Sequence, residues 1–221
     1  MTRRSTESSQ YLMSFLPILF VIGACTAPGP SYSSSGNMQS GQSRQDQIAR
    51  GRFLVLSHDC GGCHGGGANP AAFGFLDGVR DTVIQVFHVG PFTTRPKNLT
   101  PDNTTGTGRF SERQIFNSMR YGLRPEETAD VEITSIVPGQ GNFPLHPHYL
   151  AVPMPWPAWR HMPDQDLWAI AAYLKNGVKA SNHKVQDSDG PPDFWASEFT
   201  VEKIGPYPAL PYPTANEKGQ R

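Results

Sequence analysis

Residues 59–67 of the chain read DCGGCHGGG, and this stretch holds two of the three cysteines, Cys60 and Cys63. Two cysteines separated by two residues can bind zinc, cycle as a redox disulfide or carry a covalent haem. The residue that follows the second cysteine, His64, distinguishes these chemistries, because neither zinc binding nor disulfide chemistry requires a histidine at that position.

A covalent haem needs two thiols, which add to its two vinyl groups, and an adjacent histidine that reaches the iron. A zinc site needs two further ligands, and the best candidates are His146 and His148, whose spacing is not that of a familiar zinc motif. A thioredoxin-type site needs the cysteines at a helix start within a βαβ unit, and no such pattern surrounds them. We therefore predict one haem c on Cys60 and Cys63, with His64 as the proximal iron ligand.

The N-terminus has the pattern of a secretory signal, which we assign to residues 1–24. Two arginines, Arg3 and Arg4, precede an apolar run over residues 11–22. That run is shorter than the ~20 residues that span a bilayer. An uncleaved anchor or a buried helix is the alternative.

The end of this signal is similar to a bacterial lipobox, with Ile22-Gly-Ala before Cys25. Lipidation of Cys25 would anchor the exported protein stably on the periplasmic side of a membrane. It would also leave Cys60 and Cys63 as a pair with no spare thiol.

Composition indicates a loop-rich chain without a nucleic-acid footprint. The 221 residues include 22 glycines and 21 prolines, so loops should outweigh regular structure. Basic and acidic residues balance at 19 each, which argues against nucleic acid as a partner.

Residues 25–45 are rich in Ser, Gly and Gln and predict a flexible tether. Residues 178–221 show no helix or strand period and predict an extended strap, with Phe194 and Trp195 docked on the domain; a disordered tail is the alternative.

Between the tether and the strap, residues 46–177 predict one mainly α-helical domain with long irregular loops. Apolar spacing predicts a helix over 45–59, ending before the double glycine at 61–62. A second helix is expected over 112–121, and an apolar run over 82–89 predicts a strand or a helical turn.

Caps and periodicity define the later helices more sharply. Ser111 and Gln114 form a capping-box pattern before the second helix, and Gly122 suits a left-handed stop. A third helix over 163–176 should bury one apolar stripe. Its members are Leu167, Ile170, Ala171 and Leu174.

Several motifs together resemble class I cytochromes c. The narrower resemblance is to the cytochrome modules in subunits of bacterial membrane-associated alcohol and aldehyde dehydrogenases. The matching pieces are Gly51-Arg-Phe53, Cys60-Gly-Gly-Cys-His64, Asn98-Leu-Thr-Pro-Asp102, Arg120-Tyr-Gly122 and Met154-Pro-Trp156. This resemblance implies a helical fold around the haem and electron transfer with other redox proteins, without enzymatic activity. Those subunits usually carry several haems and this chain carries one, which leaves open whether it is a complex subunit or a free carrier.

The sixth iron ligand has three methionine candidates. Met119 shares a helix face with Ile115, which favours core packing, and Met162 precedes the last predicted helix and is the second choice. Met154 lies between alternating prolines over residues 152–157, which favour an extended chain that could hold its sulfur near the iron. The resemblance places the ligand there too, so we predict Met154.

Other assignments stay open at this stage. Bis-histidine ligation through His146 or His148 is one alternative, with His88 and His161 as ordinary loop residues. Contacts with the haem propionates or walls are weaker guesses for Arg95, Lys97 and Trp156. A sensor or peroxidase-like protein with an open iron site and a zinc-stabilised interaction module are the competing function classes.

Overall fold

The computed structural model describes residues 43–80, 86–188 and 193–204. The predicted signal peptide, Cys25 and most of the predicted tether lie outside these residues, as does the chain beyond Ile204. Within the described part, no helix is both long enough and apolar enough to cross a membrane.

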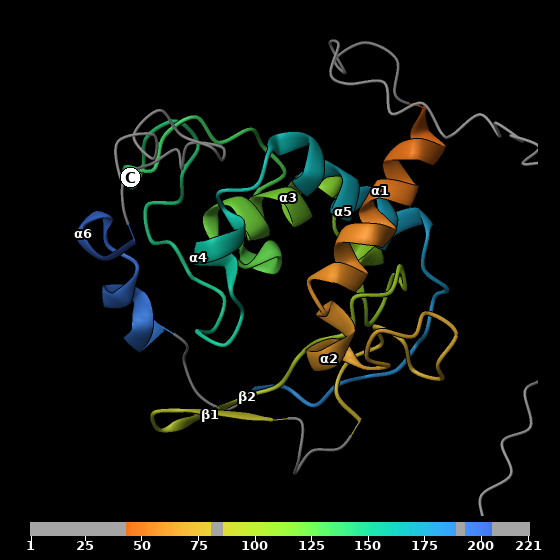
Figure 1. Ribbon diagram of the computed structural model, residues 1–221. Helices are drawn as coiled ribbons and strands as arrows, with labels where there is room; N and C mark the ends of the chain where they lie inside the picture. The colour runs from red at the N-terminus through yellow and green to blue at the C-terminus, as the bar shows by residue number, and fades with distance from the viewer. Residues whose placement is uncertain (1–42, 81–85, 189–192, 205–221) are drawn as a thin grey trace, which may run out of the picture. The chain divides into compact units, whose positions relative to one another are not determined.

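The described residues are mainly helical, with one short hairpin (Figure 1). This confirms the predicted fold class, including the long irregular loops. The α-helices are α1 (Arg44–Ser57), α2 (Cys60–His64), α3 (Glu112–Tyr121), α4 (Trp156–Trp159), α5 (Asp164–Asn176) and α6 (Val201–Ile204). The 3-10 helices are η1 (Thr107–Arg109), η2 (Pro125–Glu127) and η3 (Asp193–Glu198), and the strands are β1 (Phe87–Val89) and β2 (Phe92–Thr94).

Helix α1 begins earlier and ends earlier than predicted. Ser43 and Asp46 form a capping box at its start, so the helix includes the last residues assigned to the tether. At its far end, Asp59 adopts a left-handed conformation with φ 49°, and the chain then starts a new helical turn, α2. The first helix thus ends before the double glycine, as predicted, but both glycines lie inside α2, a helical turn that the sequence did not predict.

Helix α3 matches its predicted bounds. The capping box between Ser111 and Gln114 is present, and Gly122 ends the helix in the left-handed region with φ 69°. Helix α5 starts at Asp164, so Pro163 occupies the cap rather than the first turn.

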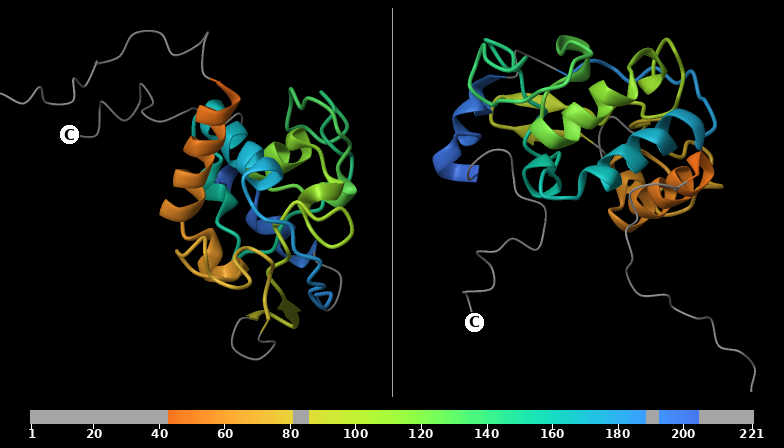
Figure 2. Two further views of the ribbon diagram at one scale, coloured as in Figure 1. Left: turned by 90° about the vertical axis from the view of Figure 1, so that its right-hand side faces the viewer. Right: turned by 90° about the horizontal axis from the view of Figure 1, so that it is seen from above.

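Helix α5 carries the main core, because it packs against both α1 and α3. In both views of Figure 2, α5 lies between these two helices. The predicted stripe is buried at this junction: Leu167, Ile170, Ala171 and Leu174 all belong to the main cluster. A second, smaller cluster under the loop after α3 consists of Leu123, Ile133 and Phe143.

The apolar run over 82–89 resolves in part as a strand. Its residues Phe87–Val89 form β1, which pairs antiparallel with β2, while residues 81–85 lie outside the described part.

The C-terminal segment leaves α5 as an extended chain over residues 179–188, as predicted for the strap, whereas the prediction was wrong over residues 193–204, where the chain is mostly helical. Trp195 is buried, as predicted, and its ring meets Phe92 edge to face at 6.2 Å. The side chain of Phe194 lies outside the described part. Two short helices, η3 and α6, lie in this segment. The sequence did not predict them, because each is too short to produce a helical period of apolar residues.

Candidate haem site

Helix α2 places the three predicted haem residues on one side of a single turn. Cys60, Cys63 and His64 are spaced i, i+3 and i+4, which is the spacing of neighbours on a helix face. Cys60 is half-buried, Cys63 is exposed and His64 is half-buried. The turn therefore presents two thiols and an imidazole together.

His64 is held in the tautomer that an iron ligand requires. Its Nδ1 lies 2.6 Å from the backbone carbonyl oxygen of Lys97. Because a carbonyl only accepts, Nδ1 carries the proton and Nε2 keeps a free lone pair. Burial lowers the pKa of His64, an effect that the hydrogen bond to Lys97 partly offsets, so the ring favours its neutral form.

The two thiols are free and their chemistry is not that of a redox pair. Burial, and then the charge of Asp59, raise the pKa of Cys60 to about 12, and the same two causes raise the pKa of Cys63. Redox-active pairs instead have a lowered thiol pKa. The disulfide alternative therefore has no support in the electrostatics of the pair.

The zinc alternative is not supported either. Among the described residues, no three His, Cys, Asp or Glu side chains come close enough together to hold a metal ion. His146 is exposed, and His148 pairs with Glu127. The four residues of the zinc hypothesis are all described, so the fold does not assemble that site.

The methionine candidates differ in how they are packed. Met119 is buried in the main cluster and Met162 packs against it. Met154 is half-buried and belongs to neither of the two clusters. Packing thus accounts for Met119 and Met162 and leaves Met154 as the one of the three candidates that belongs to neither cluster.

The Met154 segment is a turn, so the prediction of an extended chain was wrong. The amide of Met154 donates to Ala151 O at 2.9 Å, and the amide of Trp156 donates to Met154 O at 2.9 Å. Pro157 then lies in the first turn of α4, where a proline loses no hydrogen bond. The prolines therefore restrict the backbone of a tight turn that leads directly into the start of α4.

Trp156 anchors this turn, which the sequence did not reveal. Its side chain is 1% exposed and stacks on Tyr149 at 5.8 Å. A Cβ on Gly122 would overlap its indole ring, so the ring lies directly against the end of α3. Within the described part of the chain, its buried Nε1 has no hydrogen-bond partner, and this donor suits an acceptor such as a haem propionate.

A buried arginine fixes the chain that follows α4. Arg120, 4% exposed, donates from Nη2 to Met162 O at 2.8 Å and also contacts Arg160 O and Asp164. The sequence marked Arg120 only as part of a motif, and no local pattern signals its partners 40 residues or more away.

Arg95 and Lys97, guessed as propionate contacts, instead face the C-terminal strap. Arg95 donates to Asp187 O at 2.7 Å, and Lys97 Nζ lies 3.2 Å from the Asp187 carboxylate.

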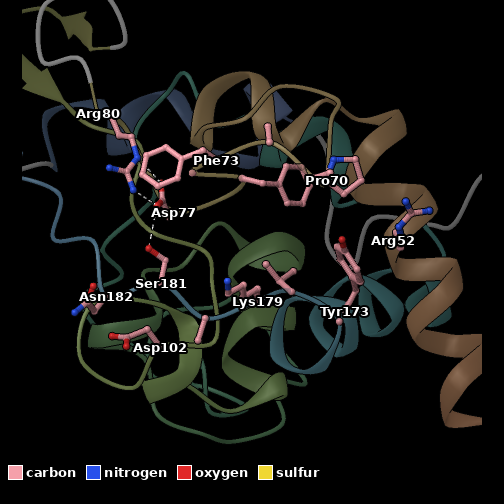
Figure 3. A pocket seen from close by; sticks show the side chains of 17 residues that line it. Arg52, Pro70, Phe73, Asp77, Arg80, Asp102, Tyr173, Lys179, Ser181 and Asn182 are labelled. Carbon is pink, nitrogen blue, oxygen red and sulfur yellow. Dashed lines mark hydrogen bonds and ion pairs between the residues drawn. The ribbon is translucent and has the colours of Figure 1, made fainter.

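A separate open pocket of about 890 Å³ lies between the 70–75 loop and the start of the strap (Figure 3). Its charged lining residues are Arg52, Asp77, Arg80, Asp102 and Lys179. None of Cys60, Cys63, His64 or Met154 lines it, so it is distinct from the predicted haem site.

Comparison with known proteins agrees with this geometry. A family model described as cytochrome c matches residues 48–177. Similar curated proteins include the gluconate 2-dehydrogenase cytochrome c subunit of Pantoea cypripedii, 27% identical over 68% of this chain, and the fructose dehydrogenase cytochrome subunit of Gluconobacter japonicus, 26% identical over 60%. The cytochrome c subunit of the quinone alcohol dehydrogenase of Gluconacetobacter polyoxogenes is 24% identical over 66%. These matches cover 27%, 21% and 24% of the relatives, so the chain spans about a quarter of their length.

Proposed function

Because the chain belongs to the cytochrome c family and carries covalent haem c, we propose that it transfers electrons one at a time, with the haem attached at Cys60 and Cys63. The axial ligands in this proposal are His64 and Met154. The observation that carries it is the hydrogen bond from His64 Nδ1 to the Lys97 carbonyl on a helix that presents two free thiols.

Haem c supplies a one-electron couple between Fe(III) and Fe(II). The residues of the chain have to keep both axial ligands in place and limit access of water. His64, neutral and fixed through Nδ1, presents Nε2 in one orientation. The Met154 turn is held at one end by Trp156, which is buried against α3. No acid, base or nucleophile is needed for this task.

The partners in this proposal are other redox proteins: a dehydrogenase, an oxidase or another cytochrome. The names of the similar proteins, all cytochrome subunits of dehydrogenases, support a dehydrogenase first. Because the charge of the chain is balanced, its association with partners in this proposal does not depend on strong electrostatic steering.

For location, we propose export and attachment to a membrane through a lipidated Cys25, on the basis of the N-terminal sequence. Cys25→Ser should release the protein from the membrane fraction and abolish labelling by a radioactive fatty acid. Unchanged labelling would contradict the anchor without bearing on the haem.

Two measurements test the redox site. A pyridine haemochrome assay on protein made with haem-maturation machinery should show one covalent haem per chain. Met154→Ala should remove the long-wavelength ferric methionine–iron band and allow carbon monoxide to bind, whereas Met162→Ala, a change in a packing methionine, should keep the band. If Met154→Ala leaves the band unchanged, the ligand assignment fails. If the wild-type protein itself binds carbon monoxide readily, an open-site sensor or peroxidase-like function replaces the carrier.

A further inference from the structure

Two backbone segments hold His64 from outside its own helix. Its Nδ1 donates to Lys97 O at 2.6 Å, and its carbonyl accepts from the amide of Gly78 at 2.8 Å. Neither segment is part of a helix or of the hairpin. The two segments hydrogen-bond each other, from the amide of Val79 to Pro96 O at 3.0 Å, and a further part of the chain packs on both.

The candidate is the part of the strap over residues 181–188, and in the following paragraphs the strap means this part. Over residues 181–186 its side chains alternate as in an extended strand that packs on one face. Ser181, His183 and Val185 are partly or fully buried, whereas the side chains between them are exposed: Asn182, Lys184 and Gln186.

The inward side chains of the strap contact residues 77–79. Ser181 Oγ donates to the Asp77 carboxylate at 2.9 Å, the contact drawn in Figure 3. His183 Nε2 lies 3.2 Å from Val79 O. Val185, 7% exposed, lies where a Cβ on Gly78 would be, so it packs directly on the residue that donates to the His64 carbonyl.

The backbone of the strap contacts residues 95–98. Asn98 Nδ2 donates to Ser181 O at 2.7 Å and to His183 O at 3.1 Å. Lys97 Nζ donates to Gln186 O at 3.2 Å, and the amide of Arg95 donates to Ser188 Oγ at 3.1 Å. The strap therefore contacts both segments that hold His64.

We propose that the strap is a positioning element for the proximal ligand, with Val185 and Ser181 as its main positioning residues. It lies beyond residues 48–177, so the part of the chain that matches the family does not contain it. By fixing the Lys97 carbonyl, the strap sets the strength of the His64 Nδ1 hydrogen bond, which in turn sets the ring orientation and the basicity of Nε2. A looser strap weakens that bond. The His64 imidazole then donates less electron density to Fe(III), and the reduction potential rises.

The test compares Val185→Ala with Lys184→Ala, an exposed neighbour on the same strap, in the full haem-loaded chain. The inference rests on the haem attachment proposed above. The first readout is the exchange rate of the His64 Nδ1 proton in the reduced protein, measured by nuclear magnetic resonance. Val185→Ala should speed this exchange about tenfold or more through local opening. The second readout, the reduction potential, should rise in Val185→Ala, and Lys184→Ala should match wild type in both.

Ser181→Ala, which removes the hydroxyl bonded to Asp77, carries the same expectation, with Asn182→Ala as its exposed control. If the Val185→Ala protein does not accumulate, the Ser181→Ala variant tests the proposal in its place. If both inward variants lower the melting temperature but leave the ring-proton exchange and the potential at wild-type values, the strap only stabilises the fold and the proposal is wrong. Failure of the proposed function has a different signature, because it would appear in the haem content or spectrum of the wild-type protein before any strap variant is made.

Discussion

At the scale of single residues, Asn98 connects more of the structure than any local pattern suggests. It is 3% exposed, and its Nδ2 donates to Thr105 Oγ1, Ser181 O and His183 O. Its Oδ1 accepts from both the amide and the hydroxyl of Thr100. The motif that contains Asn98 could be recognised from the sequence, but its role could not, because its strap partners lie 83 and 85 residues downstream.

Replacing Asn98 should be costly, since the change removes the hydrogen-bond partner of the Thr100 amide and of the His183 carbonyl. We expect Asn98→Ala to lower the free energy of unfolding of the haem-loaded protein by about 2–4 kcal/mol, because each unsatisfied buried group costs roughly 1–3 kcal/mol and some regain water. Urea unfolding measures this loss. Asn182→Ala, which alters an exposed asparagine of the strap, should stay within about 0.5 kcal/mol of wild type. Equal effects at the two positions would contradict the assigned role.

At the scale of elements, the helices that could be predicted are those with both a cap and an apolar period. Helix α3 has its capping box and its glycine stop, and α5 has a full buried stripe. Helices α2 and α4 have five and four residues, too few for a period, and contain glycines or a proline that usually indicate loops. Their helical turns depend on tertiary contacts, such as Trp156 against α3, that no local pattern encodes.

The contact between α1 and α5 depends on a missing side chain. A Cβ on Gly51 would overlap the carbonyl oxygen of Ala169 and would lie 2.7 Å from Tyr173 Cβ, so the two helix backbones approach closely. Gly51→Ala should therefore push the helices apart and destabilise the protein by roughly 1–3 kcal/mol or more, as overpacking does, despite the better helix propensity of alanine. Thermal unfolding checks this, with Ala49→Ser on the exposed face of α1 as the control. A more stable Gly51→Ala variant would rule out the close approach.

The turn after Asn98 should show a pH dependence. The amides of Thr105 and Thr104, together with the Thr105 hydroxyl, hold the pKa of Asp102 below its ordinary value of 3.8. A lowered carboxyl pKa contributes stability above the unfolded-state value, and this contribution is lost as the pH falls through the folded-state value. Asp102→Asn keeps an acceptor oxygen but removes the charge, so it should be slightly less stable than wild type at pH 7. The difference between their melting temperatures should shrink below the ordinary pKa and in high salt. A difference that stays constant down to strongly acidic pH would contradict this.

At the scale of the whole molecule, the candidate ligands come from parts of the chain that adjoin different clusters. His64 adjoins the main core and is held by segments that the strap contacts, whereas Met154 follows the loop that covers the small cluster of Leu123, Ile133 and Phe143. The sequence could predict both ligand candidates, because each has a local signature. It could not predict what supports them, since that support consists of contacts between distant segments.

The small cluster should control how firmly the Met154 side of the site is held. Leu123 is fully buried, and its bridge to Tyr149 joins the loop to the chain just before the Met154 turn. Leu123→Ala should therefore destabilise the loop locally, whereas Leu167→Ala, in the fully buried main core, should lower global stability by about 2–5 kcal/mol. Hydrogen exchange should separate the two variants: amides of residues 131–143 lose protection in Leu123→Ala while those of α5 do not, and in Leu167→Ala both sets weaken together. If Met154 is the distal ligand, Leu123→Ala should also speed its displacement by an added exogenous ligand more than Leu167→Ala does. The opposite order, with faster displacement in Leu167→Ala, would mean that the distal side depends on the main core and not on the loop cluster.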